Sequence, residues 1–276
     1  MIFFKEKHMK LKMKLMAAAV ALVASAGANA AIDNGAGGNG ELFFSIWDAN
    51  GSYTRSLETS IDSFQSQLAA TGNLALSWAA DTTFTSFLAG VASPAALKWN
   101  VVALDGVGAR RLLTTYTLPE TNPIMTADVV RSAVLNGQGF VNAVNTALGN
   151  TTTVVSPLDS VAVGSSSAAW AGKPTFKDNF DLFNFSNAGT LARNSYANGL
   201  GFMRIDAGGT GTNLSGYNEY LEGTTAVNAW LDQSGTLNIG AVATVAAIPE
   251  PSEYALMLAG LGMLGFMARR RLNNRA

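Results

Sequence analysis

Two apolar segments, one near each end of the 276-residue chain, confine the folded body to the residues between them. Near the N-terminus, Lys10, Lys12 and Lys14 precede an uninterrupted apolar run at residues 15–24. Near the C-terminus, residues 254–268 carry no charge and are followed at once by three arginines. Basic residues beside an apolar run are typical of segments that enter a membrane. The chain therefore divides into an N-terminal segment, a body and a C-terminal segment.

Residues 1–30 contain the three parts of a secretory signal peptide. The lysines form the basic part and residues 15–24 form the apolar part. Ala28 and Ala30 supply the small side chains that signal peptidase accepts before its cleavage point. We therefore expect signal peptidase to cut after Ala30, so that the mature protein begins at Ala31.

The C-terminal segment, residues 249–276, is short for a permanent membrane anchor. As a helix, residues 254–268 would span about 22 Å, whereas the hydrocarbon core of a bilayer is about 30 Å thick. The arginines that follow could extend the span by snorkelling and should stay cytoplasmic. Pro249 and Pro251 keep the preceding peptide extended. We expect a transmembrane helix over residues 254–268 that anchors the precursor, with the body outside the cytoplasmic membrane.

The C-terminal segment resembles the PEP-CTERM protein-sorting signal. Three features in order carry the resemblance: the triplet Pro249, Glu250 and Pro251, a short apolar helix, and the cluster Arg269, Arg270 and Arg271. The resemblance implies an exported protein of a Gram-negative bacterium that makes exopolysaccharide. It also implies that exosortase, a membrane protease, recognises the Pro-Glu-Pro triplet and removes the helix. It covers residues 249–271 and leaves the family of the body open.

The composition excludes several kinds of catalytic and binding site. The chain has no cysteine, and its one histidine, His8, precedes Met9, which we favour as the start over Met1 and Met13. Thiol nucleophiles, Ser-His-Asp triads and Cys or His zinc sites are therefore excluded from the body. Residues 31–250 carry nine basic and 17 acidic residues, a net charge of −8, which argues against nucleic acid as a partner. We expect no cofactor and no resident metal.

Residues 31–248 are expected to form one α+β body dominated by β-strands. A sandwich with short helical insertions is the architecture that we consider, and a boundary near residue 150 would instead give two smaller units. The Gly-rich stretch at residues 35–40 is expected to be a flexible leader.

Local patterns predict three hairpins and several helices. The hairpins join residues 41–47 to 52–54, residues 99–104 to 112–118, and residues 225–231 to 236–239, and residues 200–205 predict a further strand. Helical spacing runs from Leu57 to Leu68 and from Phe84 to Val91. Thr126 is expected to cap a helix over residues 127–135 that stops at Gly137, with another short helix over residues 140–148.

Two acidic patterns have both a chemical and a structural interpretation. Asp48, Asn50 and Gly51 resemble the start of a calcium loop but lack its later ligands, so a hairpin turn is favoured. Asp178 and Asp181 could form the carboxylate pair of a glycoside hydrolase. A strand of alternating polar and apolar residues with solvent-facing acids is favoured over that pair.

Glycine and tryptophan patterns give two further candidates. The stretch Gly208, Gly209 and Gly211 lacks the lysine of a phosphate-binding loop, so a mobile loop is favoured. The flat indoles of the five tryptophans could stack on sugars, although core packing explains most such residues. They are Trp47, Trp78, Trp99, Trp170 and Trp230.

The favoured function is that of an exported, non-catalytic surface or matrix protein that is associated with exopolysaccharide in a biofilm. Its partners would be signal peptidase and exosortase as processing enzymes, the membrane before processing, and exopolysaccharide. The alternative is a secreted, carboxylate-based polysaccharide hydrolase or lyase.

Overall fold

A computed structural model describes residues 31–70, 74–108, 110–117, 125–150, 158–181, 187–188, 198–222 and 225–241. The chain divides into one unit at residues 1–242 and a second at residues 243–276, and all described residues belong to the first. The predicted signal peptide and C-terminal segment therefore lie outside the described residues, including Ala28 and Ala30, the Pro-Glu-Pro triplet and the arginine cluster. Within the described ranges no helix is long and apolar enough to cross a membrane.

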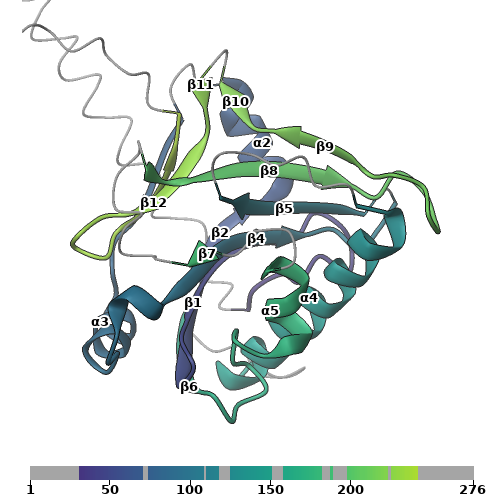
Figure 1. Cartoon of the computed structure of the whole chain (residues 1–276). Coiled ribbons are helices and arrows are strands. Elements are labelled where there is room, and N and C mark those ends of the chain that lie inside the picture. Colours follow the sequence, from purple (N-terminus) through teal and green to yellow (C-terminus); the bar gives the residue numbers. More distant parts are fainter. Residues whose placement is uncertain are drawn as a thin grey trace, which may run out of the picture. The chain divides into compact units, whose positions relative to one another are not determined.

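The body is built on one curled antiparallel sheet of eleven strands (Figure 1). In spatial order its path runs through β3 (Ala75–Trp78), β13 (Leu237–Gly240), β12 (Asn228–Leu231), β8 (Leu200–Asp206), β5 (Arg111–Tyr116), β4 (Lys98–Leu104), β1 (Glu41–Trp47), β2 (Gly51–Ser60) and β6 (Ser160–Gly164). Off this path, β7 (Asn187–Ala188) pairs with β4 and β9 (Gly216–Glu219) pairs with β8. β10 (Leu221–Glu222) and β11 (Thr225–Ala226) form a separate two-stranded ribbon.

The predicted dominance of β-structure is confirmed, but the architecture is a curled half-barrel rather than a sandwich of two sheets. Strands from both sides of residue 150 are neighbours in this sheet, since β8 lies between β5 and β12. A sheet that curls in this way encloses apolar side chains on its inner face without a second sheet.

Helices cover the sheet where its curl leaves apolar side chains uncovered. They are α2 (Ile61–Ala70), α3 (Thr82–Ala89), α4 (Ala127–Ala147), α5 (Pro174–Asp181) and the short 3₁₀ helix η1 (Pro94–Ala96). Figure 1 shows α4 and α5 side by side against the sheet, and α4 contacts β4, β5, β6 and β8.

Both faces of the central strands are buried, which explains their nearly continuous apolar runs. In β4, Trp99 and Val101 belong to the core inside the curl, whereas Val102 and Leu104 belong to the core beneath α4 and α5. β1 alternates in the same way, with Phe44 inside the curl and its neighbours on the helix-covered face. Successive side chains of a strand point to opposite faces, so such strands need apolar residues at nearly every position.

The predicted hairpins form because their turns are specified locally. β1 pairs with β2 across Asn50-Gly51, β4 pairs with β5, and β12 pairs with β13. In the β12–β13 turn, the Asp232 carboxylate accepts hydrogen bonds from the backbone N–H groups of Ser234 and Thr236, and Gly235 takes a positive φ of 81°. Burial of the carboxylate favours a higher pKa for Asp232, but these hydrogen bonds stabilise its charged form and hold the pKa below its ordinary value.

Three helix predictions were wrong at their boundaries. Leu57 lies in β2, which continues to Ser60, so α2 begins only at Ile61. Gly137 does not stop the first predicted helix, and the two expected helices are one, α4. A Cβ at Gly137 would lie 2.8 Å from Cδ1 of Leu104, so the missing side chain makes room for the sheet. Tertiary packing here outweighs the low helix propensity of glycine.

Thr126 is the N-cap residue of α4, as predicted, but its side chain makes no capping hydrogen bond. The carbonyl groups of Asn213 and Gly211 instead accept hydrogen bonds from the first N–H groups of the helix. The Asp128 carboxylate accepts one in return from the Gly211 N–H. The stretch expected to be a mobile loop is therefore attached to the start of α4.

The Gly-rich stretch at residues 35–40 is not the flexible leader that its composition suggests. The carbonyl of Gly35 accepts hydrogen bonds from the N–H groups of Gly38 and Gly106, and the Gly40 N–H donates to the Leu104 carbonyl. Asn39 accepts a hydrogen bond from the first turn of α2. The stretch is thus a backbone connector between the β4–β5 hairpin and α2.

Ile32, just before this connector, is also fixed. Ile32 is buried, and its N–H and C=O groups are both hydrogen-bonded at 2.9 Å to the side-chain amide of Asn145 on α4. The predicted signal-peptidase site therefore ends directly before the first residues that pack on the body.

We expect N-terminal sequencing of the exported protein to begin at Ala31. Ala28 and Ala30 provide the small-residue site, and a cut there leaves Ile32 free to dock on Asn145. Exported protein that still carries residues 1–24 would contradict this prediction, and Ala30→Arg should serve as the uncleaved control.

Candidate functional site

A surface pocket lined by aromatic and charged residues lies at the β1–β2 turn. It has a volume of about 220 Å³. Its lining includes two indoles, one carboxylate and two ammonium groups, from Trp47, Trp170, Asp48, Lys98 and Lys177. We call this site the indole pocket. It combines a flat apolar wall with charged groups, as small-molecule sites commonly do.

Trp170 is held in place from two sides. Its indole N–H donates a 3.2 Å hydrogen bond to the carbonyl of Asp48 in the β1–β2 turn. Its ring lies directly on the backbone of Gly172, where an added Cβ would come within 2.3 Å of the indole Cζ2. The side chain is only partly buried. Trp170 therefore presents a fixed aromatic surface to the pocket.

The loop that carries Trp170 is attached to the same hairpin. The Ser165 N–H donates to the Asn50 carbonyl, and the Ala171 N–H donates to the hydroxyl of Ser52. Phe176, at the start of α5, packs against Trp47 with ring centroids 6.4 Å apart. The wall of the pocket is thus part of the packed core and not a free loop.

Asp48 serves the turn as well as the pocket. Its Oδ1 accepts hydrogen bonds from the N–H groups of Asn50 and Gly51 at 2.8 and 2.9 Å. The favoured interpretation of Asp48, Asn50 and Gly51 as a hairpin turn is confirmed. Among the described residues, no group of three acids or histidines is placed to hold a metal ion.

Two lysines bring positive charge to the pocket. Lys98 is the cross-strand partner of Trp47, so both side chains lie on the helix-covered face of the sheet. Lys177 comes from α5. Neither lysine was predicted from the sequence as a site residue. Their rarity was the available signal, since the body contains only Lys98, Lys173 and Lys177.

The acidic pair lies on α5, so the predicted strand at Asp178 and Asp181 was wrong. The apolar residues of this stretch follow a helical spacing, and Phe176 anchors the helix by stacking on Phe140 with ring centroids 4.0 Å apart. The side chains of both aspartates lie outside the described part of the structure.

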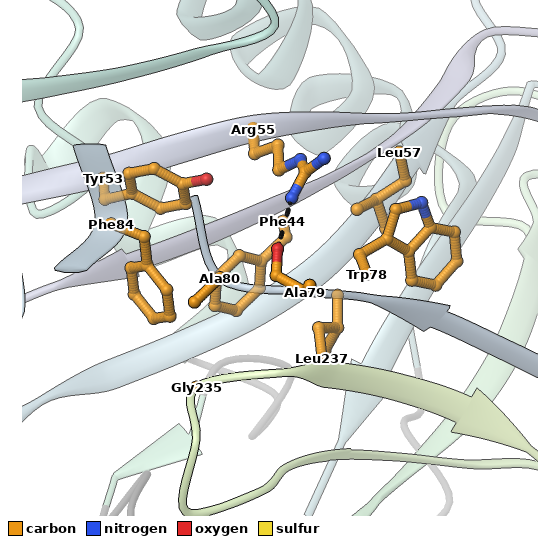
Figure 2. Close-up of a pocket in the computed structure, with 10 residues that line it drawn as sticks. All are labelled: Phe44, Tyr53, Arg55, Leu57, Trp78, Ala79, Ala80, Phe84, Gly235 and Leu237. Carbon is orange, nitrogen blue, oxygen red and sulfur yellow. Dashed lines mark hydrogen bonds between the residues drawn. The ribbon is translucent and has the colours of Figure 1, made fainter. Parts of the chain in front are cut away.

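A second cavity lies inside the curl and is shown in Figure 2. Its volume is about 10 Å³, close to the space that one water molecule needs. The Tyr53 hydroxyl donates a 2.6 Å hydrogen bond to Asp81, and Arg55 donates one of 2.8 Å to the Ala79 carbonyl. The cavity is too small for a sugar, so these groups stabilise the fold.

The ionisation of this Tyr53–Asp81 pair follows from its surroundings. Burial and the neighbouring carboxylate raise the pKa of Tyr53. Burial alone would raise the pKa of Asp81, but hydrogen bonds from Tyr53 and the Phe84 N–H hold it below its ordinary value. Asp81 also caps α3 through that N–H, so its charged form stabilises the helix start.

The tryptophans fall into two groups. Trp47, Trp78 and Trp99 are buried in the two cores, as the core-packing interpretation predicts. Trp170 and Trp230 are partly exposed, and of these two Trp170 lines the indole pocket.

The C-terminal segment is the part of the chain that matches a known family model. Residues 247–271 match the family model of the PEP-CTERM protein-sorting motif. The chain carries a PEP-CTERM sorting motif. Comparison with curated proteins and with solved structures gives no match.

The PEP-CTERM motif points to an exported, surface-directed protein and implies processing by exosortase. It begins shortly after the body ends, since β13 stops at Gly240 and the N–H of Ala241 donates to the Leu74 carbonyl. Five residues separate Ala241 from the first matched residue. The matched region contains the predicted sorting residues Pro249, Glu250 and Pro251 and the arginine cluster.

Proposed function

We propose that the chain is a non-catalytic component of the cell surface or extracellular matrix that associates with exopolysaccharide in a biofilm. The PEP-CTERM motif is the observation that carries this proposal. The precursor would be held in the membrane by residues 254–268 until exosortase cuts. The released body would then be a compact β-structure that needs no disulfide.

The indole pocket supports a binding role more than a hydrolytic one. Glycoside hydrolysis by paired acids needs two carboxyl groups about 5–9 Å apart. Asp48 is the one carboxylate among the described residues that line the pocket, and its Oδ1 is bound to the turn. A partly exposed indole beside charged groups suits contact with a sugar ring.

Substituting Glu250 by alanine should hinder processing by exosortase and leave export and folding intact. Glu250 is the only charge in the triplet, so it is the group that a basic site on the protease can recognise. The assay is an immunoblot of the tagged full chain in a host with exosortase and in its deletion strain. Glu253→Ala is the matched control, because Glu253 lies outside the triplet and should leave processing unchanged.

The same assay tests the membrane orientation and the sorting itself. Replacing Arg269, Arg270 and Arg271 by serine should weaken the orientation of the precursor, because cytoplasmic arginines fix it. Equal processing in the two strains would contradict sorting by exosortase. Loss of the protein from the matrix fraction in the deletion strain would support the surface role.

A further inference from the structure

We infer that the indole pocket binds one acidic sugar unit, a uronate, of an extracellular polysaccharide. The inference rests on the proposed function and names the ligand class of its binding site. The remainder of the polymer would lie along the surface outside, because a pocket of about 220 Å³ is smaller than the roughly 300–1,000 Å³ of sites for drug-sized ligands.

The fixed indole of Trp170 supplies the surface on which a sugar ring can stack. The face of an aromatic ring carries negative charge, and the C–H groups of a pyranose ring carry small positive charges. Because Gly172 and the Asp48 carbonyl already hold the indole, stacking requires little loss of side-chain freedom. A platform prepared in this way raises affinity by lowering the entropic cost of binding.

The charges of the pocket select an acid over a neutral sugar. Among the described residues that line the pocket, Lys98 and Lys177 bring two positive charges and Asp48 brings one negative charge. These two ammonium groups line a pocket on a body whose residues 31–250 sum to −8. Elsewhere the acidic body repels a polyanion, so attraction is concentrated where the two lysines meet the indole.

The test compares the binding of a charged saccharide with that of its uncharged methyl ester. Trigalacturonate and its fully methylated ester are titrated by calorimetry into the full chain, purified in mild detergent. We expect the acid to bind about tenfold more tightly than the ester, and the preference to shrink as salt is raised. Equal affinity for the two, or no binding of the acid, would overturn the inference.

Variants assign the binding to the pocket. Trp170→Ala should weaken both saccharides by about tenfold, and Trp170→Phe should retain most of the affinity because a flat ring remains. Lys98→Gln combined with Lys177→Gln should abolish the preference for the acid and leave the ester unchanged. This double variant keeps the Trp170 hydrogen bond, so it tests the inference even where Trp170→Ala disturbs the loop.

Matched controls come from outside the pocket. Trp230→Ala removes the other partly exposed indole, and Lys173→Gln removes the third lysine of the body. Neither should change the affinity for trigalacturonate, and an effect equal to that of the pocket variants would overturn the assignment. Normal exosortase processing without saccharide binding would refute this inference alone. Saccharide binding by a chain that exosortase does not process would refute the proposed function instead.

Discussion

Replacing Gly35 by alanine is expected to lower the free energy of unfolding by about 3 kcal/mol or more. Gly35 has a φ of +69°, and an added Cβ would lie 1.8 Å from the carbonyl oxygen of Leu104. That oxygen is part of the backbone at the end of β4 and cannot rotate away. The connector would have to separate from the β4–β5 hairpin.

The loss should extend beyond the site of substitution. The Gly35 carbonyl accepts hydrogen bonds from two N–H groups, and the same connector contacts the first turn of α2 through Asn39 and Gly40. Displacing it would expose buried polar groups, each of which costs about 1–3 kcal/mol when left unpaired. Urea denaturation monitored by circular dichroism measures the change.

Gly37→Ala is the matched control, because nothing lies within 4 Å of a Cβ built at Gly37. It should change the free energy of unfolding by no more than about 0.5 kcal/mol, as surface substitutions usually do. A similar loss in both variants would show that the connector tolerates no substitution for reasons other than the contact with Leu104.

This glycine also shows what the sequence could not reveal. The composition of residues 35–40 is that of a flexible linker, and the partner that fixes them lies about 70 residues away in β4. Gly137 was misread for the same reason, since Leu104 decides its role. Local rules identify the residues that permit a backbone contact but not the contact itself.

The hairpin turns could be predicted from the sequence because the residues that determine them lie within a few positions of each other. Asp48 with Gly51, and Asp232 with Gly235, form their hydrogen bonds inside the turn. The PEP-CTERM motif could be recognised from the sequence for a similar reason, because it is one contiguous stretch of residues.

The indole pocket could not be predicted from the sequence, because its lining comes from three separate segments of the chain. The β1–β2 turn, the start of β4 and the loop into α5 meet only after the sheet has formed. The flat indoles were recognised as a feature that suits sugars, but the sequence could not distinguish Trp170 from the buried tryptophans. Burial depends on the curl of the sheet, which no local pattern encodes.

Replacing Trp99 by alanine should lower the free energy of unfolding by about 3–5 kcal/mol. Trp99 is fully buried inside the curl, and its ring meets that of Phe44 with centroids 6.0 Å apart. Removing the indole leaves a cavity where strands from the middle of the sheet converge. The same denaturation measurement determines the loss, and the fluorescence of the remaining tryptophans reports whether the core loosens.

Two further variants separate lost volume from lost tryptophan chemistry. The indole N–H of Trp99 has no hydrogen-bond partner among the described residues, so Trp99→Phe removes a costly buried donor while keeping an aromatic ring. We expect Trp99→Phe to cost less than half as much as Trp99→Ala. Trp230→Ala, at a partly exposed position of β12, should cost still less. A loss at Trp230 as large as that at Trp99 would mean that burial inside the curl does not set the stability of this sheet.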